Sequence, residues 1–298
     1  MAVCMKKYFL LLLFAAIMLG IIFPLGRHVK PSIPYLLATL MFFNFYHMKF
    51  AAQHFFQRGV PIYCLLVLFV FPWLIFTATK TFPAPFRIGM FLSAISPAAI
   101  SGPVIVGLIR GSREIAVTNV VIFNLLAPFS YPILMKSYFQ TNDLTIPFWP
   151  LISKLLMLVF LPFILSCLAK RSQGLNGLIQ GFSGSSHAIL LLIIYIAISS
   201  SSVSLRHIPA RDLALLTITI VLLAGSFYLS GYLSGRGLDM KKALGSTLGH
   251  KNCSLCIWLA LANFDPLAAI PPTVYMITQH LFNTLLICYF NRERSRVT

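Results

Sequence analysis

The chain has 298 residues, of which 58% are hydrophobic and only 10% are charged, whereas about 25% of the residues of a soluble domain are charged. This composition excludes an ordinary soluble domain and indicates a polytopic protein whose partner is the lipid bilayer. The net charge of +17 does not indicate a nucleic-acid partner, because the basic residues gather at the ends of apolar segments, as in cytoplasmic loops of membrane proteins.

Ten apolar segments are candidates to cross a bilayer, since a crossing takes about 20 helical residues. We expect an all-α protein whose spans lie at residues 8–25, 31–48, 59–78, 86–109, 115–137, 147–169, 186–203, 212–233, 240–262 and 268–290. The connecting loops are short, so no soluble domain is expected. The first segment follows Lys6 and Lys7 as a signal peptide would, but no clear cleavage site comes after it, and we interpret it as the first membrane helix.

Residues that break helices interrupt two of these spans. The fourth, within SAISPAAISGPVIVGLIRG (residues 93–111), contains Pro97, Gly102 and Pro103, and the ninth is interrupted from Gly249 to Asn252. A broken helix at membrane depth is tolerated only where protein buries it or where it lines a cavity. Paired interruptions indicate a transporter site, although proline and glycine are also common in ordinary membrane helices.

The two interruptions occupy matching places in the two halves of the chain. Gly102 and Lys251 are 149 residues apart, which is half of 298. We therefore expect a first repeat over residues 1–142, with spans one to five, and a second over residues 143–298, with spans six to ten. Because each half holds an odd number of spans, the repeats would be inverted relative to each other in the membrane.

The distribution of lysine and arginine predicts the orientation of the spans. With a cytoplasmic N-terminus, most of the 23 basic residues fall on the cytoplasmic side, including Lys170 and Arg171 after the sixth span. Cytoplasmic loops carry such an excess. We expect a multi-pass protein of the inner, cytoplasmic membrane of a cell, with both termini in the cytoplasm.

Lys251 is the charged residue that lies well inside a long apolar segment, GSTLGHKNCSLCIWLALANF (residues 245–264). A cation at bilayer depth is costly and is tolerated mainly where it faces protein or water, so such a residue is by default a functional one. The bland alternative is a lysine that lies in a wet crevice or extends to the membrane surface.

At these two interruptions the chain resembles the bile acid:sodium symporter (BASS) family and its bacterial relatives. Residues 96–132 contain a small-residue break, a basic-glycine turn and a helix that reaches Leu-Leu-Ala-Pro at residues 125–128. Residues 248–264, LGHKNCSLCIWLALANF, are similar to the family's Gly-x-Gln-Asn-Ser-x-Leu run. The resemblance implies a secondary transporter with a core domain, in which helices four and nine are unwound and cross, and a panel domain made by the outer helices. It would move substrate by alternating access.

The chain departs from the family at the positions that hold two sodium ions in sodium-coupled members. The family's glutamate and glutamine on helix nine correspond to Thr247 and Lys251, and its Ser-Asn pair on helix four corresponds to Gly102 and Pro103. Its hydroxyl residues on helix five correspond to Ala116 and Val120, and the six acids of the chain fall in loops or at span ends. A hard cation prefers several oxygen ligands and negative charge. Sodium is therefore a doubtful partner.

We hypothesise that the Lys251 ammonium takes the place of one sodium ion. Its three N–H donors would satisfy carbonyls freed by the break in helix nine and the unwound backbone near Ser101 and Gly102. Transport would then be independent of sodium. Two other versions stay open: Lys251 is titratable and couples transport to protons, or it attracts an anionic substrate directly.

A small organic anion of the carboxylate type is the expected substrate, because the half-helices that begin near Pro103 and Asn252 direct N–H groups and positive dipole ends into the crossing. The polar side chains can equally make hydrogen bonds between helices. The candidate substrate-binding residues are Ser101, Gly102, Pro103, Asn252, Ser254, Asn119 and Asn124. The candidate ion-site equivalents are Lys251, Thr247 and His250.

Other functional classes find less support. An enzyme would need clustered acids, histidines or a nucleophile–base pair, so no catalytic residue, cofactor or metal site is expected. Cys253 and Cys256 form a C-x-x-C without a second pair, and we interpret them as small packing residues. The alternatives that stay open are a non-transporting membrane receptor or assembly protein on a carrier fold, and another inverted-repeat effluxer.

Overall fold

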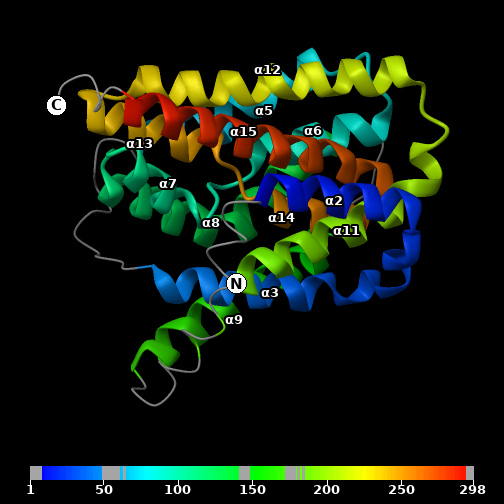
Figure 1. Ribbon diagram of the computed structural model, residues 1–298, viewed down its shortest axis with the longest axis horizontal. Helices are drawn as coiled ribbons and strands as arrows, with labels where there is room; N and C mark the ends of the chain where they lie inside the picture. The colour runs from blue at the N-terminus through cyan, green and yellow to red at the C-terminus, as the bar shows by residue number, and fades with distance from the viewer. Residues whose placement is uncertain are drawn as a thin grey trace.

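A computed structural model describes residues 9–48, 61–62, 65–140, 148–171, 179, 182 and 185–292. Over these residues the chain is built from helices, and its strand pairing is limited to one isolated bridge between Ala98 and Lys251 (Figure 1). The all-α class predicted from composition is therefore observed in the described part of the chain.

The first half of the chain contains the helices that lead to the first break and away from it. In order these are α2 (Phe9–Ile22), the 3₁₀-helix η1 (Pro24–Ser32), α3 (Ile33–His47), the π-helical segment η3 (Leu65–Val70), α5 (Phe71–Ala78), α6 (Ala84–Ile95), α7 (Gly102–Leu108) and α8 (Arg113–Gln140).

The second half follows the same order of long and interrupted helices. It contains α9 (Phe148–Arg171), α11 (Ser186–Leu205), α12 (Ala210–Ser234), α13 (Leu238–Gly249), α14 (Cys253–Asn263), the 3₁₀-helix η5 (Pro266–Ala269) and α15 (Ile270–Arg292). Helical residues thus occupy the described part of each of the ten predicted ranges.

Four of these helices, α8, α9, α11 and α12, are long and apolar enough to cross a membrane. A fifth candidate is the bent pair Leu11–Ile22 and Pro24–His47, whose two parts meet at 105°. Of the remaining predicted spans, the tenth is the continuous helix α15, which is long but less apolar, and the third, fourth and ninth contain shorter helices. A multi-pass membrane protein is therefore supported, while ten crossings and an inverted relation between residues 1–142 and 143–298 stay predictions.

Helix packing brings the halves of the two interrupted spans together crosswise. The segment before each break contacts the segment after the other, so that α6 packs on α14 and α7 packs on α13. In Figure 1, α7 and α13 lie toward one end of the molecule and α6 toward the other. The two breaks therefore meet in the interior, as the resemblance implies for helices four and nine.

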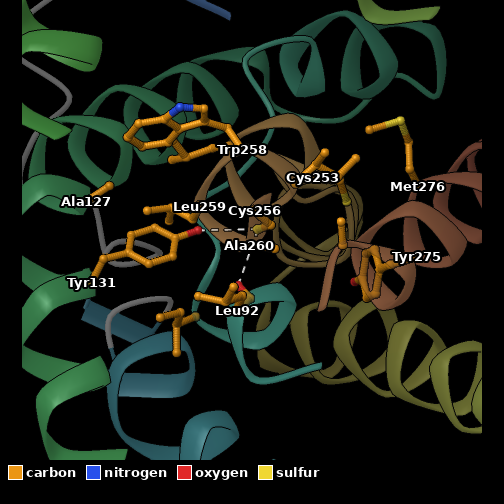
Figure 2. Packing of buried hydrophobic residues seen from close by; sticks show 14 of the residues in the cluster. Leu92, Ala127, Tyr131, Cys253, Cys256, Trp258, Leu259, Ala260, Tyr275 and Met276 are labelled. Carbon is orange, nitrogen blue, oxygen red and sulfur yellow. Dashed lines mark hydrogen bonds between the residues drawn. The ribbon is translucent and has the colours of Figure 1, made fainter. Parts of the chain in front are cut away.

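α14 is enclosed by the rest of the protein, with buried residues from Cys253 to Leu261. A helix that is apolar on all sides is one that needs surrounding protein or lipid. Figure 2 shows the Tyr131 hydroxyl directed at the Cys256 sulfur, 3.4 Å away, and that sulfur also lies 3.3 Å from the carbonyl oxygen of Leu92. Cys253 and Cys256 are both free thiols, and their contacts fit the interpretation as packing residues.

Candidate functional site

The break in the fourth span begins at a proline. Ser96, the residue before Pro97, has extended backbone with ψ of 135°, and α6 ends just before it. The proline ring disfavours helical backbone in the preceding residue, which explains this end. The chain resumes a helix at Gly102, with Pro103 in its first turn, where the missing N–H of proline matters least.

The break in the ninth span depends on a glycine. A Cβ atom at Gly249 would collide with the ring of Tyr228 on α12. The next residue, His250, leaves the helix with extended backbone (φ −90°, ψ 92°), and α14 starts at Cys253. The close approach of α12 therefore fixes the place where α13 ends.

The two breaks pair with each other as a short antiparallel bridge. The N–H of Ala99 donates to the carbonyl oxygen of His250 at 2.7 Å, and the N–H of Asn252 donates to that of Pro97 at 2.9 Å. Buried backbone groups need partners, and here each broken span satisfies the other. The paired segment at residues 97–99 and 250–252 is referred to below as the crossing.

The Lys251 ammonium is buried at this crossing. The residue is fully inaccessible to solvent, and Nζ donates to the carbonyl oxygens of Ser96 at 3.1 Å and Ala94 at 3.3 Å. These carbonyls belong to the C-terminal end of α6, where the helix dipole is negative. Nζ also lies 4.2 Å from the ring centroid of Phe227, a distance at which a cation is attracted to the ring face.

The acceptors of Lys251 differ in part from those expected from the sequence. We expected the ammonium to reach carbonyls of helix nine and backbone near Ser101 and Gly102, whereas it donates to carbonyl oxygens that precede Pro97. The physical reason is the direction of the helix: the end of α6 offers unpaired carbonyls, while the start of α7 offers N–H groups, which repel an ammonium. Helix four thus supplies acceptors, as expected, and contacts with helix nine and near Ser101 and Gly102 stay predictions.

Three of the candidate substrate residues form one hydrogen-bonded chain. Ser254 donates to Asn252 Oδ1 at 3.0 Å, and Asn252 Nδ2 donates to Asn124 Oδ1 at 3.1 Å. Asn124 in turn donates to the carbonyl oxygen of Ala98 at 2.9 Å. This series of hydrogen bonds links α14, α8 and the crossing.

Three positions that correspond to sodium ligands in the family also come together. A Cβ atom added to Gly102 would lie 3.8 Å from Val120 Cγ2 and 3.9 Å from Thr247 Cγ2. The Thr247 hydroxyl donates within its own helix, to the carbonyl oxygen of Ala243 at 2.8 Å. The side-chain atoms nearest to Gly102 in this comparison are thus methyl carbons of Val120 and Thr247.

The other candidates are more dispersed. Ser101 is exposed, whereas Pro103 is buried at the start of α7. The His250 ring lies 5.8 Å from that of His280 on α15, and its Nδ1 atom is buried without a hydrogen-bond partner among the described residues. Asn119 is fully buried, and neither amide atom has a partner in the part of the chain that the structure describes.

Sequence reasoning missed the contribution of α15. Gln279 accepts from the Lys251 N–H at 2.8 Å and donates to its carbonyl oxygen at 3.2 Å, and Tyr275 donates to the carbonyl oxygen of Gly249 at 2.8 Å. With Asn283, these residues recur every fourth position on one face of an apolar span. That spacing is the signal that could have indicated them.

In the described part of the chain, the carboxylates stand at the starts of helices and not within residues 97–99 or 250–252. The acids placed by the structure stand in first turns or at a cap, namely Glu114, Asp212, Asp239 and Asp265. Among these residues no group of three or more His, Cys, Asp or Glu side chains is placed to hold a metal ion.

An apolar, multi-helix protein whose two interrupted helices meet in its interior has the architecture of a membrane carrier with discontinuous helices. The chain matches the SBF-like CPA transporter family over residues 7–291, and it belongs to that family. Membership confirms the resemblance to bile acid:sodium symporters and assigns the chain to transporters rather than enzymes.

Curated relatives carry related names. A Bacillus subtilis protein named "Uncharacterized sodium-dependent transporter YocS" is 28% identical over 221 residues, covering 71% of this chain and 66% of that protein. YbaS of the same organism is 23% identical over 290 residues, covering 88% of this chain and 89% of YbaS. "Probable sodium/metabolite cotransporter BASS4, chloroplastic" of Oryza sativa subsp. indica is 28% identical over 151 residues, covering 48% of this chain and 36% of the rice protein. The chain thus spans just under two thirds of the first relative and about a third of the rice protein.

Proposed function

We propose that this chain is a secondary transporter that moves a small organic anion by alternating access without sodium, with Lys251 as a built-in cation. It works in the inner membrane with both termini in the cytoplasm. The observation that carries the proposal is the ammonium of Lys251, fully buried and donating to the carbonyl oxygens of Ala94 and Ser96.

Sodium independence is supported by what surrounds that ammonium. Sodium needs oxygen ligands and negative charge, yet at one expected ion position Gly102 has no side chain, and a Cβ atom there would meet methyl carbons of Val120 and Thr247. At the second expected ion position, Lys251 stands where sodium-coupled members of the family have a glutamine. An ammonium and a sodium ion at the same carbonyls would repel each other strongly in a medium of low dielectric constant. Two relatives are named for sodium, so this chain would have kept the carrier fold and changed the coupling.

An anionic substrate is supported by electrostatics. The crossing holds a buried cation, and the acids that the structure describes stand in first turns or at a cap, so an incoming carboxylate would be attracted to the ammonium. The N-terminus of α14 lies at the same place, with Asn252 as its N-cap and Ser254 in its first turn. Helix N-termini favour anions. We propose Asn252, Ser254 and Asn124 as substrate contacts, since they already form one polar chain, with Ser101, Gly102, Pro103 and Asn119 as further candidates.

Reconstituted protein tests the proposal directly. Cholate, pyruvate and benzoate serve as amphipathic, small and aromatic carboxylate probes: thermal shift first identifies a probe that binds, and uptake into liposomes then follows it in sodium or potassium buffer. We expect equal uptake in both buffers. Strong sodium stimulation that disappears in potassium would contradict the proposal, and a probe that binds but never enters the vesicles would instead favour a receptor.

Lys251→Met provides the residue-level test. We expect uptake to fall at least tenfold, because the substitution removes the buried cation while keeping most of the side-chain volume. Lys241→Met is the matched control: it removes the same charge from the other end of α13, where Lys241 Nζ lies 5.6 Å from the Tyr232 ring centroid. Uptake by the control variant should stay within a factor of about two, on the order of the ±0.5 kcal/mol typical of surface changes.

A further inference from the structure

The backbone N–H and C=O groups of Lys251 lie at the centre of the break in the ninth span, and both need partners on the side away from the fourth span. In an antiparallel pair, opposite residues alternate between those that exchange hydrogen bonds and those that do not. Ala98 and Lys251 are a pair of the second kind, because the bonds are made by their neighbours. The N–H and C=O groups of Lys251 therefore point away from residues 97–99.

Gln279 bonds to both of these groups with one side chain, and the Lys251 carbonyl oxygen also accepts from the Cys253 N–H at 2.9 Å. Its Oε1 atom accepts from the Lys251 N–H at 2.8 Å, and its Nε2 atom donates to the Lys251 carbonyl oxygen at 3.2 Å. A carboxamide has one acceptor and two donors close together, so it can pair with a peptide as a neighbouring strand would. The glutamine is 3% exposed, and water has little access to compete.

Neighbouring contacts fix the glutamine in turn. Tyr275, one turn earlier on α15, donates to the carbonyl oxygen of Gly249 at 2.8 Å. Tyr228 of α12 donates to the Gln279 carbonyl oxygen at 3.3 Å and to Asn283 Oδ1 at 2.7 Å. One face of α15 thus holds both the end of α13 and the first residues after it.

The first half of the chain contains a related contact. Asn124 on α8 donates to the carbonyl oxygen of Ala98, as Gln279 on α15 donates to that of Lys251. In each half, a side-chain amide on the helix after the interrupted span thus donates to the central carbonyl oxygen of that span, although Asn124 Oδ1 accepts from Asn252 and not from a backbone N–H. The separations are similar, 26 residues from Ala98 to Asn124 and 28 from Lys251 to Gln279.

We propose that Gln279 is a positioning residue: it holds the break in the ninth span in its paired form and so directs the Lys251 ammonium onto the carbonyl oxygens of Ala94 and Ser96. The proposal deepens the role of Lys251 given above and rests on it. Rotation of the Lys251 backbone would move its side chain away from α6. The pair of hydrogen bonds between Gln279 and the Lys251 backbone, called the amide clamp below, is therefore required for the position of the ammonium.

Hydrogen exchange of the purified protein tests the clamp without substrate or sodium. Mass spectrometry with residue-level fragmentation reads the Lys251 amide, which lies outside both helices. We expect it to exchange as slowly as amides inside α14. In Gln279→Met, exchange at Lys251 should rise at least tenfold, while peptides from α12 stay unchanged. Gln279→Glu keeps an acceptor for the Lys251 N–H and should recover part of the protection. Thr284→Val, on the same helix with only a bond to the His280 carbonyl oxygen, is the control.

The position of the ammonium needs its own readout. Protein labelled with ¹⁵N at lysine Nζ gives a resonance for Lys251 that is assigned by its loss in Lys251→Gln. In Gln279→Met that resonance should shift or broaden, and in Thr284→Val it should not. Fast exchange of the Lys251 amide in the wild-type protein would overturn the proposal, even if every variant fails to fold. An ammonium resonance that is unchanged in Gln279→Met would also overturn it. Sodium-stimulated uptake with an intact clamp would instead overturn the proposed function alone.

Discussion

A buried lysine is stable at the crossing because three partners of two kinds share its charge. Two helix-terminal carbonyl oxygens accept hydrogen bonds from the ammonium, and the ring centroid of Phe227 lies 4.2 Å from Nζ. Hydrogen bonds to charged groups are each worth about 1.5–3 kcal/mol, and a desolvated cation–π contact is worth about 2 kcal/mol. Together these offset a desolvation penalty of several kcal/mol for one ion. These partners hold the ammonium at the C-terminal end of α6.

At the scale of single residues, the contacts of Asn124 predict how much its substitution would destabilise the protein. Its amide donates to the carbonyl oxygens of Ala98 and Val120 and accepts from Asn252. Asn124→Leu would leave at least two buried polar groups unpaired, so we expect a loss of about 2–4 kcal/mol from the free energy of unfolding, at about 1–3 kcal/mol for each such group. Denaturant titration in detergent measures it.

Asn263→Leu is the matched control for that experiment. Asn263 is only half-buried and bonds within its own helix, to the carbonyl oxygen of Leu259 at 3.0 Å. We expect its loss to stay below about 1 kcal/mol, as for most partly exposed positions. Equal losses of unfolding free energy in the two variants would show that the hydrogen bonds of Asn124 contribute no more to stability than a bond within one helix.

The sequence predicted the unusual residues better than their partners. Pro97, Gly102 and Gly249 break helices by local stereochemistry, and a lysine in an apolar span is visible without a structure. Gln279 and Phe227 lie 28 and 24 positions from Lys251 in the sequence. No local spacing rule connects residues at such separations, because their contacts depend on how the helices pack.

At the scale of elements, glycine determines how closely helices approach. A Cβ atom on Gly231 of α12 would overlap the backbone of α13, with the carbonyl carbon of Leu244 at 2.7 Å and the Cα atom of Gly245 at 2.9 Å. Small residues allow membrane helices to pack backbone against backbone. The contact also places Tyr228 against Gly249, so the α12–α13 interface positions the break.

Gly231→Ala should therefore destabilise the protein. The added methyl group meets backbone that cannot rotate away, and such overpacking costs about 1–3 kcal/mol. Gly225→Ala, six residues earlier on α12, is the control, because its nearest neighbour would be Phe282 at 3.8 Å, an ordinary contact. That control should be neutral or stabilising by up to about 1 kcal/mol, the helix propensity of alanine over glycine. Thermal unfolding in one detergent ranks both; a melting temperature for Gly231→Ala equal to that of the wild-type protein would show that the helices can separate.

The element boundaries show where hydropathy carries enough information and where it does not. The long spans α8, α9, α11 and α12 were predicted within a few residues, because each is a continuous apolar run. The junction of the first two predicted spans is instead a 3₁₀-helix at Pro24–Ser32, and the third span contains a π-helical segment at Leu65–Val70. Hydropathy does not distinguish these helix types, since they differ in hydrogen bonding and not in composition.

At the scale of the whole molecule, the two side-chain amide contacts at the breaks are an argument for internal symmetry. Asn124 follows its break by 26 residues and Gln279 follows its own by 28. The order of elements is also the same: two helices of an interrupted span, then a long helix that carries the amide. Weak internal repetition of this kind is typical of carriers built from inverted repeats. The sequence length alone indicated only where the halves would divide.

The predicted orientation of the spans follows from this symmetry and from the basic loops, and reporter fusions test it. If both termini are cytoplasmic and each half has five spans, the turns near Gly111 and Gly235 face the cytoplasm, while those near Lys80 and His207 face outward. Alkaline phosphatase, active only outside, should be active after residues 80 and 207 and inactive after 111 and 235. Green fluorescent protein should give the reverse. A contradicting result would be phosphatase activity after residues 80 and 207 together with activity after residue 111 or residue 235. One half of the chain would then have an even number of spans, and the two halves could not be inverted relative to each other in the membrane.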